Sequence, residues 1–146
     1  MEQNFTVEFT GICLEWYESL TETWQDEIDV VTYLLEHYGP AIPRAYSKPA
    51  EGSTYSHMLE LRIQCQGHPI RILYAFDPKR TAILLIGGDK TGDGRWYKKN
   101  IPKADELYKQ HLASLQPIKS RKDGKENRRD PGKNVPGKKR KKQASS

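Results

Sequence analysis

The stretch MLELRIQCQGHPIRILYAF, residues 58–76, decides the fold because apolar and polar side chains alternate on both sides of Gln66-Gly67. An alternation of period two is typical of half-buried β-strands, and the two residues between the runs predict an antiparallel hairpin. Closing the hairpin at this point pairs apolar residues with apolar residues, whereas a slip of one residue would separate them. The same register places Arg62 directly opposite Arg71.

A third strand and a final helix are expected after the hairpin. The turn at residues 77–80 leads into residues 82–86, which are apolar on both faces and therefore predict a central strand. Apolar residues recur along one side of residues 103–115, a pattern that predicts a helix. The glycine-rich stretch between them, residues 87–99, is expected to be a connection.

A strand and two helices are expected before the hairpin. Residues 4–10 alternate as a half-buried strand does, and residues 12–20 are apolar enough for a short helix. Ser19 and Glu22 have the spacing of a capping box, which predicts the start of a longer helix. That helix is expected to end at Gly39-Pro40. Residues 40–57 show no clear period and are interpreted as a loop.

These elements predict an α+β fold in the order β-α-α-β-β-β-α, with an antiparallel sheet packed against helices. If the first strand returns beside the hairpin, the long helix covers one sheet face and leaves the opposite face available for a ligand. A chain of 146 residues is close to the size of one domain, and that domain is expected to span residues 1–116. Residues 117–146 contain few large aliphatic side chains and are predicted to be a disordered basic tail.

The net charge of +5 is distributed unevenly along the chain. Residues 1–40 hold nine acidic side chains and no Lys or Arg, while residues 117–146 hold twelve basic and three acidic side chains. The segment between them holds twelve basic and seven acidic side chains. A basic second half suggests attraction to phosphate, and an acidic first half is expected to face solvent or a basic partner. A purely solvated surface is the alternative.

The facing arginines are the first candidate site. Two like charges directly opposite in a sheet destabilise it by an amount comparable to the ~0.2–1 kcal/mol that a favourable pair contributes. An anion between the two charges would make their interaction favourable. A phosphate is one such anion. Glu60, on the same strand face as Arg62, is another, so ion pairing and phosphate binding both remain open for this pair.

The second candidate site lies in residues 87–99, where cations and aromatic rings occur together. Cationic groups contact phosphates, aromatic rings stack on unpaired bases, and a phenol can donate or accept a proton, which together suit RNA. Trp96 and Tyr97 are alternatively apolar cover for the last helix, Trp96 being the better core candidate. The cations and aromatics in question are Lys90, Arg95, Trp96, Tyr97, Lys98 and Lys99.

Several classes of protein are disfavoured by the sequence. The four histidines lack the spacing of a zinc site, and Cys13 and Cys65 form no metal or redox motif, so no metal and no small-molecule cofactor is expected. Both thiols are interpreted as reduced core residues. No run approaches the ~18 apolar residues of a membrane span, and the N-terminus lacks a secretory pattern, which predicts a cytoplasmic protein with no membrane partner.

At these residues the chain resembles the RelE/HigB/ParE toxin superfamily, particularly its phage-derived HigB-like branch. The resemblance spans about residues 5–112 and rests on three motifs. They are Glu60-Leu61-Arg62, then Arg71-Ile72-Leu73-Tyr74-Ala75-Phe76-Asp77, then Leu85-Ile86-Gly87-Gly88-Asp89-Lys90-Thr91. The resemblance implies a RelE-like fold for the predicted elements.

The resemblance also implies an activity, the ribosome-dependent cleavage of messenger RNA by attack of the RNA's own 2′-hydroxyl on the adjacent phosphate. Such an enzyme is a metal-independent endoribonuclease that inhibits translation. The positions that match the family are Glu60, Arg62, Arg71 and Lys90, and the resemblance implies that the basic ones lie in an RNA-facing groove. For this activity the residues expected to be catalytic are Arg62 and Arg71 for the charge on the phosphorane, Lys90 for orienting the scissile phosphate or assisting proton transfer, and Tyr97 as an acid or base. The residues expected to bind RNA are Glu60, Arg95, Trp96, Lys98 and Lys99.

The partners implied by the resemblance are the ribosome, messenger RNA and a cognate antitoxin with a helix-turn-helix domain. Two other functions share the fold. One is a ParE-like toxin that inhibits DNA gyrase without cutting RNA, and the other is an inactive nucleic-acid-binding adaptor or repressor. Fold alone does not separate these three.

Overall fold

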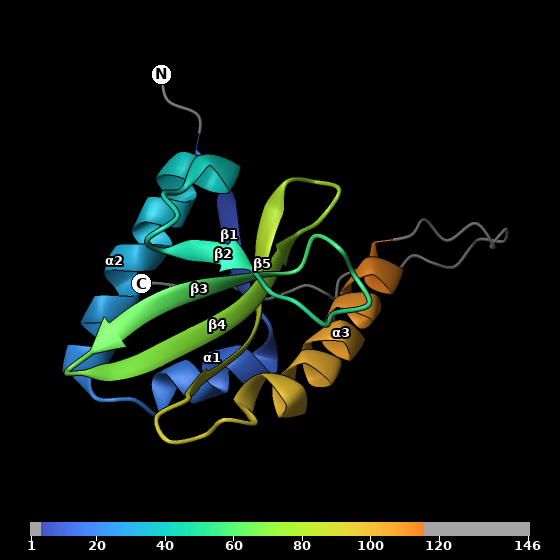
Figure 1. Cartoon of the computed structure of the whole chain (residues 1–146). Helices are drawn as coiled ribbons and strands as arrows, with labels where there is room; N and C mark the ends of the chain where they lie inside the picture. The colour runs from blue at the N-terminus through green and yellow to red at the C-terminus, as the bar shows by residue number, and fades with distance from the viewer. Residues whose placement is uncertain (1–3, 116–146) are drawn as a thin grey trace, which may run out of the picture. The chain divides into compact units, whose positions relative to one another are not determined.

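The computed structural model describes residues 4–115, which form a five-stranded sheet and three α-helices (Figure 1). The compact unit ends at Gln110, and the described part of the unit that begins at His111 is the end of the last helix with one turn residue. In chain order the elements are β1 Thr6–Phe9, α1 Gly11–Glu18, α2 Glu22–Tyr38, the 3-10 helix η1 Gly39–Ala41, β2 Ser47–Pro49, β3 Leu59–Cys65, β4 His68–Phe76, β5 Thr81–Asp89 and α3 Trp96–Ser114.

The predicted α+β class and hairpin register are confirmed. Strands β3 and β4 pair antiparallel across Gln66-Gly67, and Arg62 is the Cα partner of Arg71. The sheet order is β1-β5-β4-β3-β2, so the first strand does return beside the meander, where it pairs parallel to β5. The register between β4 and β5 shifts once, between Leu73 and Tyr74.

Helices α1 and α2 cover one face of the sheet (Figure 1). The apolar side of α2 is buried because Ile28, Val31 and Leu35 recur at steps of three and four residues. Cys13 and Cys65 lie in the same core, as predicted, and burial raises the pKa of both thiols. Both thiols are free and protonated at neutral pH, which makes them poor nucleophiles.

The opposite sheet face is only partly open, which corrects the expectation that it is free for a ligand. Helix α3 buries Trp96, Ile101, Ala104 and Tyr108. The Tyr108 hydroxyl donates to the Phe76 carbonyl oxygen at 2.7 Å, which fixes this part of α3 to the sheet. The part of this face that α3 leaves uncovered includes Arg62, which is partly exposed.

Three local predictions were wrong. The long helix is capped by Thr21, which accepts from the Trp24 N–H at 3.3 Å, because Ser19 ends α1 and donates to the Trp16 carbonyl instead. The last helix begins at residue 96, not 103. The predicted loop 40–57 contains the short strand β2, which extends the sheet beyond β3.

Strand β2 is fixed to the sheet by a side-chain hydrogen bond. The Ser47 and Tyr74 hydroxyls lie 2.7 Å apart in the interior, and burial raises the pKa of Tyr74 to about 12. The predicted basic tail, residues 117–146, lies outside the described residues. Within residues 4–115, no helix is both long and apolar enough to cross a membrane.

Candidate functional site

The two facing arginines share one buried carboxylate. Glu60 is 4% exposed, and its Oε2 accepts from Arg62 Nη1 at 2.9 Å. Its Oε1 lies 3.9 Å from Arg71 Nε. Arg71 is itself only 7% exposed, and its Nη1 donates to the Ile70 carbonyl at 3.0 Å. The ion pairing that the sequence left open is therefore present, and it holds both guanidinium groups in fixed positions.

Tyr97 joins this group from the first turn of α3. Its hydroxyl donates to Glu60 Oε1 at 2.5 Å and accepts from Arg71 Nε at 3.2 Å. Burial and then the Glu60 hydrogen bond raise the pKa of Tyr97, and they outweigh Arg71, which acts to lower it. Of the two roles expected for Tyr97, acid or base, the raised pKa favours the acid, because a carboxylate in contact with the phenol disfavours its ionisation. We call Glu60, Arg62, Arg71 and Tyr97 the arginine site.

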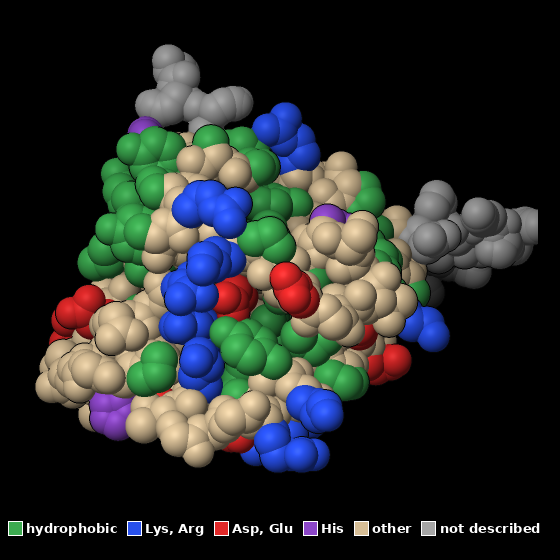
Figure 2. Space-filling view, in the orientation of Figure 1, with side chains coloured by type: hydrophobic (Ala, Val, Ile, Leu, Met, Phe, Trp, Pro, Cys, Tyr) green, Lys and Arg blue, Asp and Glu red, His purple; other side chains and the backbone are tan. Residues whose placement is uncertain are grey.

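Lys90 and Lys48 flank the arginine site. The Lys90 Nζ lies 5.8 Å from the centre of the Tyr97 ring, a cation–π contact that places it beside the Tyr97 side of the arginine site. Lys48 of β2 is the Cα partner of Glu60 and therefore lies on the same sheet face. Sequence reasoning missed Lys48 because β2 has only three residues, too few for a visible alternation. Figure 2 shows Lys and Arg side chains in a row down this face.

The other predicted RNA-binding residues are not equally available. Trp96 is 5% exposed and packs against Gly88, so it is a core residue and cannot stack on a base. Lys99 is paired with Asp93 at 2.8 Å. Arg95 and Lys98 are exposed at the start of α3.

A second polar cluster lies where the start of β4 meets the end of β5. His68 Nδ1 lies 2.9 Å from Asp89 Oδ2 and 3.1 Å from the Thr91 hydroxyl. Partial burial acts to raise the pKa of Asp89, but hydrogen bonds from Thr91 and His68 outweigh it and lower that pKa. Asp89 also accepts from the Thr91 N–H at 2.9 Å, so it shapes the turn that carries Lys90.

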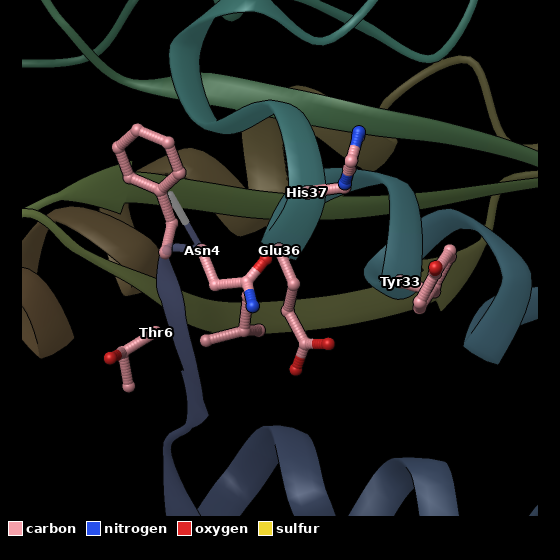
Figure 3. Close-up of a pocket in the computed structure, with 7 residues that line it drawn as sticks. Asn4, Thr6, Tyr33, Glu36 and His37 are labelled. Carbon is pink, nitrogen blue, oxygen red and sulfur yellow. The ribbon is translucent and has the colours of Figure 1, made fainter. Parts of the chain in front are cut away.

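A surface hollow lies between the start of β1 and the end of α2 (Figure 3). Asn4 and Thr6 line it from the β1 side, and Tyr33, Glu36 and His37 line it from α2. Burial raises the pKa of Glu36. The hollow contains no pair of a nucleophile and a base, and it adjoins the acidic side of α2. Within residues 4–115, no group of three His, Cys, Asp or Glu side chains could hold a metal ion.

The family model of the phage derived protein Gp49-like (DUF891) matches residues 15–109 of this chain. The chain belongs to this family. The HigB-like membership predicted from the sequence is thereby confirmed, and the matched residues of this Gp49-like chain include the whole arginine site.

Two curated relatives of the Gp49-like chain come from Mycobacterium tuberculosis. The chain is 44% identical to the putative toxin HigB3 over 100 residues, a match that covers 68% of this chain and 86% of HigB3. It is 39% identical over 106 residues to the putative toxin HigB2, which covers 66% of this chain and 53% of HigB2. The chain therefore spans about half the length of HigB2.

Two solved structures are also similar to the Gp49-like chain. One is a mutant of the Escherichia coli toxin RelE in the free state, with a TM-score of 0.47 and 11% identity, covering 78% of this chain and 100% of RelE. The other is a chain of the archaeal RelE-RelB complex from Pyrococcus horikoshii, with a TM-score of 0.46 and 16% identity over 60% of this chain and 97% of that one.

Proposed function

We propose that this chain is the toxin of a type II toxin-antitoxin pair and that it cuts RNA at the arginine site. Membership in the Gp49-like family, with relatives named as putative toxins, supports the toxin part of the proposal. One observation carries the RNA part. Arg62 and Arg71 are Cα partners held in place by Glu60 and Tyr97, and Arg62 is partly exposed whereas Arg71 is 7% exposed.

The proposed reaction needs cations at a fixed position. When a 2′-hydroxyl attacks the adjacent phosphate, negative charge develops on the phosphorane, and preorganised cations stabilise that charge without further rearrangement. A guanidinium also presents a planar fork that matches two phosphate oxygens. Arg62 and Arg71 supply this charge, and Lys90 beside Tyr97 contacts the scissile phosphate.

Tyr97 acts as a proton donor in this proposal. Its raised pKa keeps the phenol protonated at neutral pH, so it can protonate a leaving 5′-oxygen but cannot serve as an efficient base. The attacking 2′-hydroxyl gives its proton to solvent water, and the Tyr97 phenolate that remains after the O–P bond breaks is reprotonated from solvent. In the structure that proton is held by Glu60, so substrate binding has to reorient the hydroxyl toward the leaving group.

The proposed substrate is messenger RNA on the ribosome, as the resemblance implies. Arg95 and Lys98, which are exposed at the start of α3, supply further phosphate contacts next to Tyr97. Cleavage is expected to require no metal, because the proposed chemistry uses the RNA's own hydroxyl and side-chain cations.

The proposed partner is a cognate antitoxin with a helix-turn-helix domain, and its basic residues dock on α2. Val30 and Tyr33 are 56% and 64% exposed on this helix, beside the hollow of Figure 3. The exposed acidic side chains around them make this surface attractive to a basic segment. They are Glu22, Asp26, Glu27, Asp29 and Glu36, which we call the acidic helix face.

The test compares three activities of the purified protein. We expect induced expression to arrest growth, and we expect the protein to cut messenger RNA on translating ribosomes with or without a chelator. Inhibition of DNA gyrase without RNA cleavage would instead identify a ParE-like toxin. RNA binding with neither cleavage nor growth arrest would identify an adaptor or repressor.

A further inference from the structure

Lys48 continues a line of cations that crosses the sheet. It comes from β2, Arg62 from β3, Arg71 from β4, and Lys90 from the turn directly after β5. Lys48 is level with Glu60, two residues from Arg62 on β3, and the Lys90 N–H donates to the Pro69 carbonyl, two residues from Arg71 on β4. Because β5, β4, β3 and β2 are successive neighbours in the sheet, these four side chains form one row that crosses the strands diagonally. We call Lys48, Arg62, Arg71 and Lys90 the basic row.

Lys48 is within reach of the arginine site. Since it is opposite Glu60, its diagonal neighbour on β3 is Arg62, and diagonal neighbours in an antiparallel pair lie about 7–8 Å apart, which long side chains can span. Lys48 is also exposed, on an edge strand with no further strand beside it in the described sheet.

The charge of Lys48 has no counter-ion within residues 4–115. Glu60 is the nearest carboxylate in the register, but its Oε2 faces Arg62 and its Oε1 faces Tyr97 and Arg71. Lys48 forms no ion pair with it. An unpaired ammonium next to two guanidinium groups is unfavourable in the free protein and becomes favourable when an anion binds between them.

The first turn of α3 packs against the sheet beside the basic row and blocks access from that side. Trp96 lies so close to β5 that its Nε1 would be 2.6 Å from a Cβ on Gly88, and Tyr97 contacts Glu60 directly. A ligand on the arginine site therefore cannot extend under α3. Its free path runs along the row, from Lys90 past the arginines to Lys48.

We infer that Lys48 binds the phosphate of a nucleotide next to the cleaved one, so that single-stranded RNA crosses the sheet along the basic row. This inference rests on the proposed function. A single strand carries one phosphate per nucleotide, and a row with one cation from each successive strand suits a chain of regularly spaced anions better than a lone phosphate. Lys48 contributes affinity and helps to set the position of the RNA along the row, whereas Arg71 contributes to the cleavage reaction.

The experiment measures binding of a short single-stranded oligonucleotide with every 2′-hydroxyl replaced by hydrogen, which cannot be cut by 2′-hydroxyl attack. Binding is followed by fluorescence anisotropy over a range of salt concentrations. The variants are K48Q, which loses the charge, and K48R, which keeps it. The control is K79A, an exposed lysine in the β4–β5 turn, beyond the end of β4 at Phe76 and outside the basic row.

We expect K48Q to lower the salt slope by about 0.7, the value of one single-strand phosphate contact. K48R and K79A should keep the slope of the unmodified protein. On ribosome-bound messenger RNA, K48Q should raise KM and leave kcat nearly unchanged. All variants should melt as the unmodified protein does, because both lysine side chains are exposed.

An unchanged slope in K48Q, or an equal loss in K79A, would overturn the inference and leave the proposed function standing. A K48Q variant that binds RNA normally but associates poorly with the antitoxin would also overturn it and would assign Lys48 to the protein partner. An unmodified protein that neither binds nor cuts RNA would overturn the proposed function and this inference together.

Discussion

The indole of Trp96 occupies the space directly over Gly88, where its Nε1 would lie 2.6 Å from an added Cβ. Side-chain atoms do not approach so closely, so Gly88 is the residue that lets α3 begin against the sheet. This contact positions the next residue, Tyr97, over Glu60. A backbone position outside the arginine site therefore controls its geometry.

Gly88→Ala is expected to destabilise the protein and to impair cleavage. Overpacking of this kind costs about 1–3 kcal/mol, and displacement of Trp96 would move the Tyr97 hydroxyl away from Glu60. The control is Gly94→Ala, where an added Cβ has no neighbour within 4 Å and the change is expected to stay within about 0.5 kcal/mol. Thermal melting and cleavage of ribosome-bound RNA check the pair. Equal effects at both glycines would contradict this role of Gly88.

The hairpin could be predicted from the sequence because its information is local. Alternation on both strands and a two-residue turn determine the register, and that register places Arg62 opposite Arg71, as in the structure. The long helix was equally visible from its apolar period. Only its cap was wrong, since Ser19 was already used to end α1.

The remaining features depend on contacts between distant residues. Helix α3 begins at Trp96 because that residue packs on Gly88, and nothing in the sequence around it announces a helix ahead of Pro102. Strand β2 forms because its backbone pairs with the edge of β3, a contact that its three residues do not reveal in the sequence. Lys48 could not be predicted as a site residue for the same reason. The Glu60 to Tyr97 hydrogen bond joins residues 37 positions apart and could not be read from spacing.

Glu60→Gln is expected to lower the pKa of Tyr97 relative to the unmodified protein. The carboxylate raises that pKa through its hydrogen bond and charge, while Arg71 acts in the opposite direction and remains in the variant. Tyrosinate absorbance, measured against Tyr97→Phe and Glu60→Gln/Tyr97→Phe backgrounds, isolates the single phenol. An unchanged Tyr97 titration would show that Glu60 does not control it.

The same phenol predicts a pH dependence of stability. Because the folded pKa of Tyr97 is raised, folding favours its neutral form, and the folded state holds its proton above the ordinary pKa of about 10. Its contribution is therefore fully present below that pH and is lost as the pH rises through the folded pKa. The alkaline decline in melting temperature should be shallower in Tyr97→Phe. A parallel decline in both proteins would contradict this contribution.

Removal of residues 117–146 is expected to leave the melting temperature unchanged, because the buried side chains of the described core lie between Cys13 and Tyr108. The shortened protein should bind RNA with a shallower salt dependence, since the segment carries twelve basic and three acidic side chains. A full-length control with Gln at the twelve basic positions should show the same slope. Loss of folding on truncation would contradict the predicted domain boundary at residue 116.

Asp26→Lys is expected to slow association with the antitoxin and to leave RNA cleavage unchanged. Asp26 belongs to the acidic helix face and makes no hydrogen bond or ion pair within the described residues, whereas Asp29 accepts from the Tyr17 hydroxyl at 2.6 Å and is a poorer choice. Glu106→Lys on α3 is the control for net charge. Stopped-flow association at low and high salt measures the effect. Equal rates for both variants would exclude α2 as the docking surface.

Arg71→Ala is expected to reduce cleavage by about 10²–10³-fold, the loss typical when one charge-stabilising group is removed from an active site. It should also destabilise the protein by about 1–3 kcal/mol, because the buried Glu60 then loses one of its partners. Arg71→Lys keeps the charge without the planar fork and should give a partial defect. The informative variant is Arg71→Ala/Glu60→Gln, which removes cation and carboxylate together. If Arg71 stabilises the phosphorane, the double variant regains stability and stays inactive. If it regains cleavage, Arg71 only neutralises Glu60, and the charge stabilisation has to come from elsewhere in the basic row.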